Sequence, residues 1–514
     1  MLNSGLFPGS PTVIRSLQQV CLIFVCAAGL SVPFPVLASS VTSLADLAEA
    51  GEFSNCLKLL SQGADPDSKQ PDGMTALHWA VYLNETPLVK ALISKGADAT
   101  TANSYGVKPI SLAALNGNEE IMKVLLAAGA DADSELAGGE TALMTAARTG
   151  IPGVVQLLID AGADPNATER KGQTATMWAA AAGNTEALKI LLEAGAEWKK
   201  PLRSGYTPFF FAIREGHRDI VRLFLQKGAD INASMEAERS GGKLPKKGTT
   251  PLILAIENGH FDLAADLLDA GADPNDQKSG YTPLHTLTWV RKPNRGDGDD
   301  GTPPPPGSGI MSSTQFIRRL LESGADPNAR LDRGSSGRGR LNTKGATPFL
   351  IASMTADLEF LRILHEFGAD PNLPNVDNAT PLMAAAGIGT LAPGEVAGTE
   401  PEAMEVIEYL LSLDADVNHV DDNGETAMHG AAYKCFPAVV DQLHKSGARL
   451  DIWNRKNKYG WTPLLIAEGW RPGNYRPSFE TMEAIHAVML ASGIQPPPRT
   501  TVDPNGPRRG YEQR

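Results

Sequence analysis

Residues 141–174 read TALMTAARTGIPGVVQLLIDAGADPNATERKGQT, and this stretch determines the fold. A capping threonine opens a short helix predicted over 141–149, and Gly150 ends it. A second helix with a Val and Leu face is predicted over Val154–Asp160, with Gly162 as its C-terminal glycine. An Asp-Pro-Asn turn then leads through an extended finger to the next threonine. One such unit cannot bury its apolar face alone, so it must stack on neighbouring units.

The unit recurs along the 514-residue chain. The threonine or equivalent residue that opens it falls at 75, 108, 141, 174, 207, 250, 282, 347, 380, 426 and 462, and six of the ten spacings lie within one residue of 33. A Gly-Ala-Asp triplet recurs at 63, 96, 129, 162, 228, 271, 324 and 368. This period predicts a solenoid stabilised by contacts between neighbours.

Three segments carry a family resemblance. Thr75-Ala-Leu-His78, Thr282-Pro-Leu-His285 and Gly271-Ala-Asp-Pro-Asn275 resemble the ankyrin repeat, and the resemblance covers about residues 41 to 495. It implies an all-α repeat solenoid of about eleven to twelve stacked helix-turn-helix repeats with extended finger loops. Residues 41–70 provide only the second half of a unit, which predicts a polar N-terminal cap.

The two ends of the chain differ from the repeats. Val20 to Leu30 is an uninterrupted apolar run, followed by small residues at the −3 and −1 positions of a cleavage site after Ala38. This pattern predicts a signal peptide over 1–38 and a periplasmic or secreted protein. An uncleaved membrane anchor is the alternative, although a spanning helix needs about 20 apolar residues. The solenoid would then occupy 39–495, followed by a disordered Pro- and Arg-rich tail over 496–514.

The C-terminal repeats resemble one group more narrowly. Gly424-Glu-Thr-Ala-Met-His-Gly-Ala-Ala-Tyr-Lys434 and Thr462-Pro-Leu-Leu-Ile-Ala-Glu-Gly469 are similar to the last repeats of exported bacterial ankyrin proteins of unassigned function. This resemblance implies a bacterial source and adds no chemistry.

Composition limits the partners. The formal net charge of −13 argues against a general nucleic-acid or anionic-membrane binder, because both would repel the chain at long range. Two cysteines remain after cleavage, Cys56 and Cys435, and they lie too far apart in a stacked array to form a disulfide. Cys56 replaces an apolar helix residue and is expected to be buried.

Insertions mark the C-terminal half of the array. Extra residues between the two helices of a unit fall near 291–311, near 387–401 and after Thr462, and a long finger covers 331–344. Loops on a rigid scaffold commonly carry function. We therefore expect this half to contribute specific recognition.

Several polar groups could be taken for chemical sites. The resemblance places His78, His285 and His429 where histidine ties neighbouring loops by hydrogen bonds, which we favour over a metal site. The Asp297-Gly-Asp-Asp-Gly301 cluster lacks the downstream glutamate of a calcium loop. The finger from Arg330 to Lys344 carries a net charge of +4. It could hold phosphate, an acidic glycan or an acidic partner, or it could be a solvated loop.

In ankyrin-like proteins, partner-binding residues lie in the fingers and at the ends of the first helices, on the concave face. Aromatic residues and Arg are favoured at protein-binding hot spots. Packing against the adjacent finger is the alternative for each ring. Transferred by position, the candidate residues are Met74, Tyr82, Arg148, Tyr206, Arg214, Tyr281, Tyr433 and Trp461. Tyr105 and Tyr459 are added because they lie at fingertips, and Arg338 and Arg340 because they belong to the basic finger.

These observations favour an exported scaffold that binds another protein through its concave face and its C-terminal insertions. No Gly-rich phosphate loop, Cys-x-x-Cys or His-Glu-x-x-His motif occurs, so no cofactor, metal or catalytic residue is predicted. A membrane-tethered scaffold is one alternative, and an enzyme or a binder of a metal or small ligand is the other. The protein is expected to be monomeric, because both ends of the array are capped.

Overall fold

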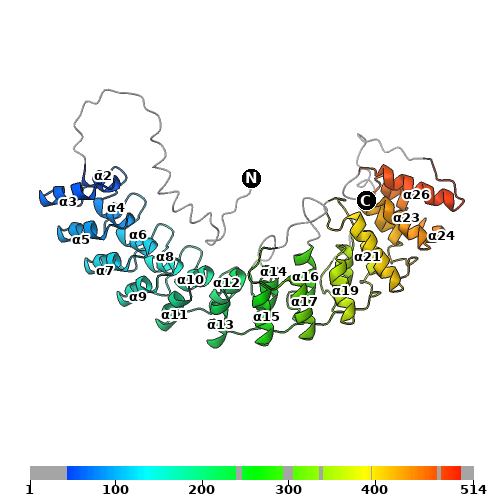
Figure 1. Cartoon of the computed structure of the whole chain (residues 1–514), viewed down its shortest axis with the longest axis horizontal. Coiled ribbons are helices and arrows are strands. Elements are labelled where there is room, and N and C mark those ends of the chain that lie inside the picture. Colours follow the sequence, from blue (N-terminus) through cyan, green and yellow to red (C-terminus); the bar gives the residue numbers. More distant parts are fainter. Residues whose placement is uncertain are drawn as a thin grey trace, which may run out of the picture. The chain divides into compact units, whose positions relative to one another are not determined.

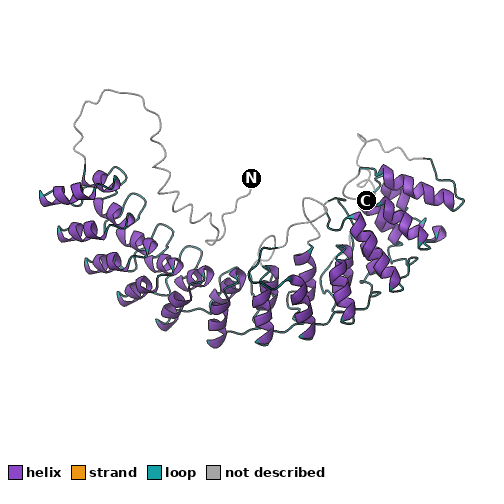
Figure 2. Ribbon diagram, viewed as in Figure 1, coloured by secondary structure: helices purple, strands orange, loops and turns teal. Residues whose placement is uncertain are grey.

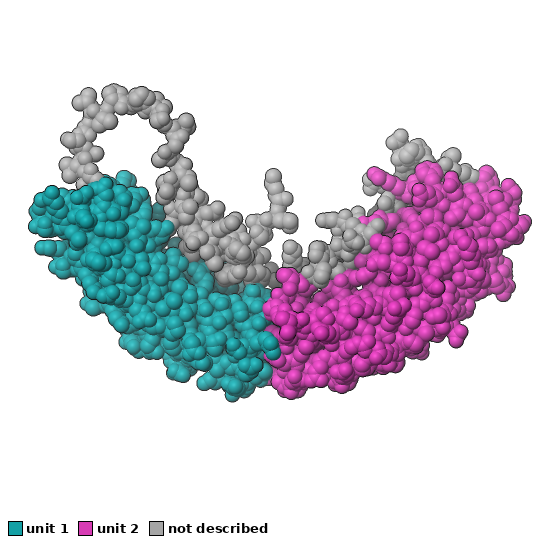
Figure 3. Space-filling model, in the orientation of Figure 1, with its two compact units in different colours: residues 1–229 teal, residues 230–514 magenta. Residues whose placement is uncertain are grey.

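The computed structural model describes residues 43–238, 246–292, 305–334, 340–394, 396–471 and 476–498. Within these residues the chain is helical, with two isolated β-bridges and no longer strand (Figure 2). It divides into two compact units, residues 1–229 and 230–514 (Figure 3). The predicted signal segment and most of the predicted tail lie outside the described residues.

The described residues of unit 1 form six helix pairs. Successive first helices contact one another, and successive second helices form another row (Figure 1). The helices are α2 (Leu44–Glu49), α3 (Phe53–Ser61), α4 (Ala76–Tyr82), α5 (Thr86–Ser94), α6 (Pro109–Asn116), α7 (Glu119–Ala127), α8 (Ala142–Thr149), α9 (Pro152–Asp160), α10 (Ala175–Ala182), α11 (Thr185–Glu193), α12 (Pro208–Glu215) and α13 (Arg218–Gln226).

The described residues of unit 2 also form six pairs, with the four-residue α24 lying between two of them. Its helices are α14 (Pro251–Glu257), α15 (Phe261–Asp269), α16 (Pro283–Arg291), α17 (Ser313–Glu322), α18 (Pro348–Met354), α19 (Leu358–Glu366), α20 (Pro381–Ala386), α21 (Glu400–Ser412), α22 (Ala427–Lys434), α23 (Pro437–Lys445), α24 (Leu450–Trp453), α25 (Pro463–Ala467) and α26 (Phe479–Ala491). The twelve pairs confirm the predicted all-α repeat solenoid.

The unit read from 141–174 forms as predicted. Thr141 Oγ1 accepts a hydrogen bond from Met144 N at 3.2 Å, which starts α8. Gly150 ends α8 with φ = 81°, and a Cβ there would lie 2.3 Å from Asn184 Oδ1. Glycine suits both this left-handed conformation and the close approach, because it has no Cβ. Asn184 Nδ2 in turn donates to the carbonyls of Ala147 and Arg148 at 2.8 and 2.7 Å, linking consecutive repeats.

The N-terminal repeat differs from the prediction, which assigned only half a unit to residues 41–70. The helix α2 precedes α3, and Ser43 and Asp46 form a capping box at its start. Leu44, Ala45 and Ala48 are buried, and α2 packs on α4. The repeat is therefore a complete pair, whose first helix opens with serine in place of the threonine signature.

Asparagine side chains join consecutive turns below the fingers. Asn275 Oδ1 accepts from Asp326 N at 2.7 Å while Asn275 Nδ2 donates to Gly324 O at 2.8 Å. Asn328 makes the same two contacts with the following turn, to Asp370 N and Gly368 O. This is the structural role of the Asp-Pro-Asn turn.

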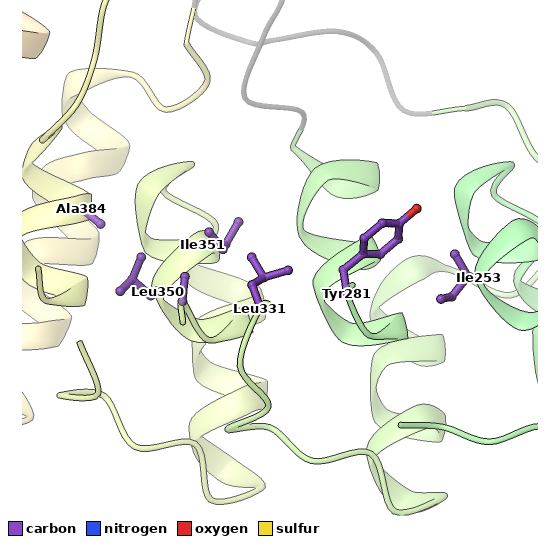
Figure 4. Packing of buried hydrophobic residues seen from close by; sticks show 7 residues of the cluster. Ile253, Tyr281, Leu331, Leu350, Ile351 and Ala384 are labelled. Atoms are coloured by element: carbon purple, nitrogen blue, oxygen red, sulfur yellow. The ribbon is translucent and has the colours of Figure 1, made fainter. Parts of the chain in front are cut away.

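The long insertion near 291–311 does not interrupt the stack in unit 2. Buried residues from α14, the following fingers, α18 and α20 form one continuous apolar cluster (Figure 4). Ile253, Tyr281 and Leu331 contribute side chains from three successive repeats. The insertion is accommodated between α16 and α17, where a loop can lengthen without displacing either helix row.

Candidate partner-binding surface

The finger face is defined here as the finger loops together with the C-terminal turns of the first helices. In a finger such as 69–75, Gln70 N donates to Met74 O at 2.9 Å, and Lys69 pairs with Thr75 across a β-bridge. Met74 is half-buried, and its Sδ accepts from Asn103 Nδ2 of the next finger at 3.3 Å. Adjacent fingers thus support one another and present a preformed surface.

Two arginines of this face lie over aromatic rings in unit 1. The Arg148 guanidinium lies 4.9 Å from the centre of the Trp178 ring, and Arg214 lies 5.3 Å from the centre of the Tyr206 ring. Burial lowers the pKa of Arg148. Both arginines keep part of their surface exposed. Arg214 also pairs with Glu215 at 2.5 Å.

Two tyrosines near the start of the chain also fall on the finger face. Tyr82 is half-buried at the end of α4, with its ring 5.9 Å from that of Trp79. Tyr105 lies at a fingertip and is 54% exposed. Tyr105 is therefore the candidate ring that offers most of its surface to a partner.

Three predicted contact residues are instead interior, which corrects their assignment. Tyr206, Tyr281 and Tyr433 are 3%, 2% and 0% exposed. Tyr206 and Tyr281 each directly precede a capping threonine, and unlike the half-buried Met74 and Trp461 at the same position, they lie inside. For these three residues the packing alternative holds, since a buried side chain cannot contact a partner.

Tyr281 illustrates this packing. Its hydroxyl donates to Glu257 Oε1 at 3.0 Å, and Lys246 Nζ lies 4.4 Å from the centre of its ring. Burial raises the pKa of Glu257 and lowers that of Lys246. Desolvation also raises the pKa of the Tyr281 hydroxyl. The Tyr281 ring is thus buried in this cluster, while Glu257 is half-buried and Lys246 is exposed.

Tyr433 belongs to a second buried polar cluster. Its hydroxyl donates to Glu425 Oε1 at 2.8 Å, and Asn457 Nδ2 donates to the same oxygen at 2.7 Å. Burial raises the pKa of Glu425 to about 7, while these two hydrogen bonds act in the opposite direction. The carboxylate is thus held between two repeats.

The remaining candidates lie at the last finger and in the basic finger. Tyr459 and Trp461 are half-buried, with ring centres 5.3 Å apart. Arg340 is exposed, while Arg338 lies outside the described residues. The Asp297 to Gly301 cluster also lies outside them.

The histidines have structural partners. His78 Nε2 lies 3.0 Å from Val107 O, and because a carbonyl can only accept, Nε2 carries the proton. Nδ1 then accepts from the amide and hydroxyl of Thr75 at 3.2 and 2.8 Å. His285 repeats this arrangement with Thr282 and Ala346 O. Both nitrogens are thereby used, and neither ring offers a lone pair to a metal.

His429 is also completely buried, and Thr426 donates to its Nδ1 at 3.2 Å. Across the described ranges, no group of three His, Cys, Asp or Glu side chains is arranged to hold a metal ion. Among the same residues, none of the helices has the length and apolarity needed to cross a bilayer. Cys56 is buried as predicted, and Cys435 is partly exposed.

The insertions are anchored at their ends. Arg291 forms a bidentate pair with Asp357, at 2.7 and 3.0 Å, where the first insertion begins. Asp262 Oδ2 accepts from the amides of Ile310 and Met311 at its far end. In the second insertion, the buried Lys434 Nζ donates to Ala397 O at 2.8 Å. These loops are built into the fold at their bases.

Comparisons with known proteins agree with the architecture. A family model described as ankyrin repeats (3 copies) matches residues 44–135 and 143–235. A model described as ankyrin repeat matches residues 247–279, and one described as ankyrin repeats (many copies) matches residues 400–444.

Curated relatives match over part of the chain. Neurogenic locus notch homolog protein 1 is 32% identical over 157 residues in Mus musculus and 31% over 158 in Homo sapiens, covering 30% of this chain. E3 ubiquitin-protein ligase KEG of Arabidopsis thaliana is 29% identical over 150 residues, covering 28%. The matched segment spans only 5% of the notch proteins and 8% of the ligase, so the likeness concerns the repeats alone.

Proposed function

The chain belongs to the ankyrin-repeat proteins, which are protein-binding scaffolds, and we propose that it holds its partner on the finger face and on the insertions of unit 2. The observation that carries this proposal is the row of partly exposed cationic and aromatic side chains on the finger face. Arg148 over Trp178 and the exposed Tyr105 are the residue types that supply most of the binding energy at protein interfaces.

The packing beneath this row supports the proposal. Arg148 is held between its own helix and the Trp178 ring, so it loses little rotamer freedom when a partner binds. Preorganised side chains bind more tightly because less conformational entropy is lost. The anchored bases of the two insertions supply the same advantage in unit 2.

Capture from an extract of the source cell tests the proposal. The variant Tyr105→Ala with Arg340→Ala removes two exposed side chains of the finger face. The control Leu57→Ala with Lys95→Ala removes one exposed apolar and one exposed cationic side chain at second helices. We expect the first variant to lose at least tenfold in captured partner and the control to match the original chain. Equal capture by both variants would place the partner elsewhere.

We also propose that the chain is exported, with cleavage after Ala38, as the apolar run and the small residues before the site suggest. A bacterial source, suggested by the C-terminal repeats, would make the compartment periplasmic or extracellular. Mass spectrometry of the mature N-terminus tests this. A chain that begins at Ser39 is expected, and one that retains Val20–Leu30 would favour a membrane-tethered scaffold.

Ankyrin-repeat proteins are generally non-enzymatic scaffolds, and we propose that this chain acts as a monomer without a catalytic site of its own. Light scattering of the purified protein should give the monomer mass. A metal or cofactor retained in stoichiometric amount after purification would contradict the proposed absence of a chemical site.

A further inference from the structure

Two neighbouring fingers of unit 1, 166–173 and 197–206, enclose a hollow of about 490 Å³. Thr174 and Met177, from the start of α10, contribute to its lining together with finger residues. The volume falls within the range of about 300 to 1,000 Å³ typical of ligand-binding pockets. We call this hollow the basic cleft, because four cationic residues line it.

The basic cleft lies where a contact between fingertips is missing. At two other finger pairs of unit 1, Ser104 N donates to Asp72 O at 2.8 Å and Arg170 N donates to Gly138 O at 3.0 Å, whereas the pair between them, Ala137 N and Tyr105 O, is not joined in this way. The next pair, one repeat further along, would be Arg203 N and Lys171 O. Within residues 43–238, all of which the structure describes, no backbone hydrogen bond joins them. The two fingertips at the basic cleft are thus not held together by this bond, and the hollow lies between their fingers.

Four cationic residues line this space: Arg170, Lys171, Lys200 and Arg203. All four are exposed, and none forms an ion pair with a carboxylate of the described residues. Cations gathered without counter-charges repel one another, and an anionic group that enters the cleft relieves this repulsion and is attracted to them.

The two glutamates of the lining do not cancel this charge. Glu169 is 9% exposed, and its Oε1 accepts from the amides of Lys171 and Gln173 at 2.9 and 3.1 Å, so its carboxylate is engaged by its own finger. When Glu197 is also counted, the lining has four cations and two anions, which gives it a net charge of +2. The whole chain, in contrast, has a net charge of −13.

We propose that the basic cleft binds an acidic, extended segment of the partner protein, an inference that rests on the proposed scaffold function. Aspartate or glutamate side chains meet Lys200 and Arg203, while Leu202, Pro201 and Met177 offer apolar surface to one side chain between them. No aromatic side chain lines the cleft, so it lacks the stacking platform that single-stranded nucleic acid needs.

A labelled twelve-residue peptide of alternating Glu and Asp around a central Leu tests the proposal, with its Gln and Asn counterpart as the neutral control. The variant Lys200→Glu with Arg203→Glu reverses two cations of the cleft. The matched variant Lys95→Glu with Lys227→Glu makes the same change in net charge at exposed ends of second helices. We expect the dissociation constant of the acidic peptide to rise at least tenfold in the first variant and less than twofold in the second.

Binding of the acidic peptide should also weaken as salt rises from 50 to 300 mM. Equal losses in both variants, equal binding of the neutral peptide, or no binding at 1 mM peptide would each overturn the proposal. Displacement by an oligouridylate or by millimolar inorganic phosphate would also overturn it, by assigning the cleft to nucleic acid or to a small anion. If partner capture still depends on Tyr105 and Arg340 while the peptide fails to bind, only this inference falls and the proposed function stands.

Discussion

Replacing Arg291 by methionine should destabilise the base of the first insertion. The guanidinium donates to both carboxylate oxygens of Asp357, and it also bonds Ser313 Oγ at 2.6 Å and Glu359 Oε2 at 2.8 Å. Arg291 therefore joins the end of α16 to the starts of α17 and α19. Asp357 has a second role, because its Oδ1 accepts from Phe360 N at 3.2 Å as the N-cap of α19.

The loss of stability expected in Arg291→Met follows from the burial of the ion pair. The side chains of Arg291 and Asp357 are 11% and 4% exposed. Removing one partner of a buried ion pair leaves the other charge without compensation, which costs about 3–5 kcal/mol. Asparagine at 357 still caps α19 and carries no charge. The double variant Arg291→Met with Asp357→Asn should therefore recover most of the stability that Arg291→Met loses.

Hydrogen exchange measured amide by amide is the appropriate assay, because a repeat array need not unfold in one step. A local loss of about 3 kcal/mol should speed exchange in α17 and α19 by more than about a hundredfold. Arg318→Met is the control, since its pair with Glu366 lies on the exposed surface, and it should leave exchange nearly unchanged. Two results would refute the reasoning. One is exchange in Arg291→Met that is as slow as in the original chain, and the other is exchange in the double variant that is faster than in both single variants.

Three further predictions concern stability. Burial raises the pKa of Glu425 from 4.5 to about 7, so the stability that the residue contributes is fully present below pH 4.5 and is lost as pH rises through 7. This loss amounts to about 3 kcal/mol and should be absent in Glu425→Gln. Urea unfolding of both chains at pH 5 and at pH 8 checks this. Burial lowers the pKa of His285 from 6.5 to about 4, so the native state loses about 3 kcal/mol as pH falls through this window, and thermal unfolding of His285→Gln should depend less on pH there. Asn275→Ala removes two hydrogen bonds between repeats and should cost about 2 kcal/mol in urea unfolding, while the same change at Asn55, whose side chain bonds only Glu52 of its own repeat, should cost far less.

The sequence predicted the repeats because each helix start depends on local chemistry. Thr141 caps α8 through its own side chain, and Gly150 must adopt a left-handed conformation, so both residues are recognisable without knowing the rest of the fold. The structural role of His78 and His285 was also predictable, through the resemblance, because each histidine lies three residues after its threonine. The predicted placement of the insertions between two helices is confirmed for 291–311 and 387–401.

Burial of the individual rings was harder to predict. Tyr105 and Tyr281 are both finger aromatics, yet one is exposed and the other is covered by the next finger and Lys246. That difference depends on contacts between repeats that residue type does not reveal. The basic cleft was missed because it depends on the spacing of two neighbouring fingers, which residue types alone do not reveal. Arg170 and Arg203, 33 residues apart in equivalent positions, were the available signal.

The central claim is that the partner binds the finger face, and hydrogen exchange of the full chain with and without the captured partner tests it most directly. We predict slower exchange in finger-loop amides, including Tyr105, Lys171 and Lys200, with the amides of α5, α7 and α9 unchanged. Protection confined to these second helices, with the fingers unaffected, would contradict the account.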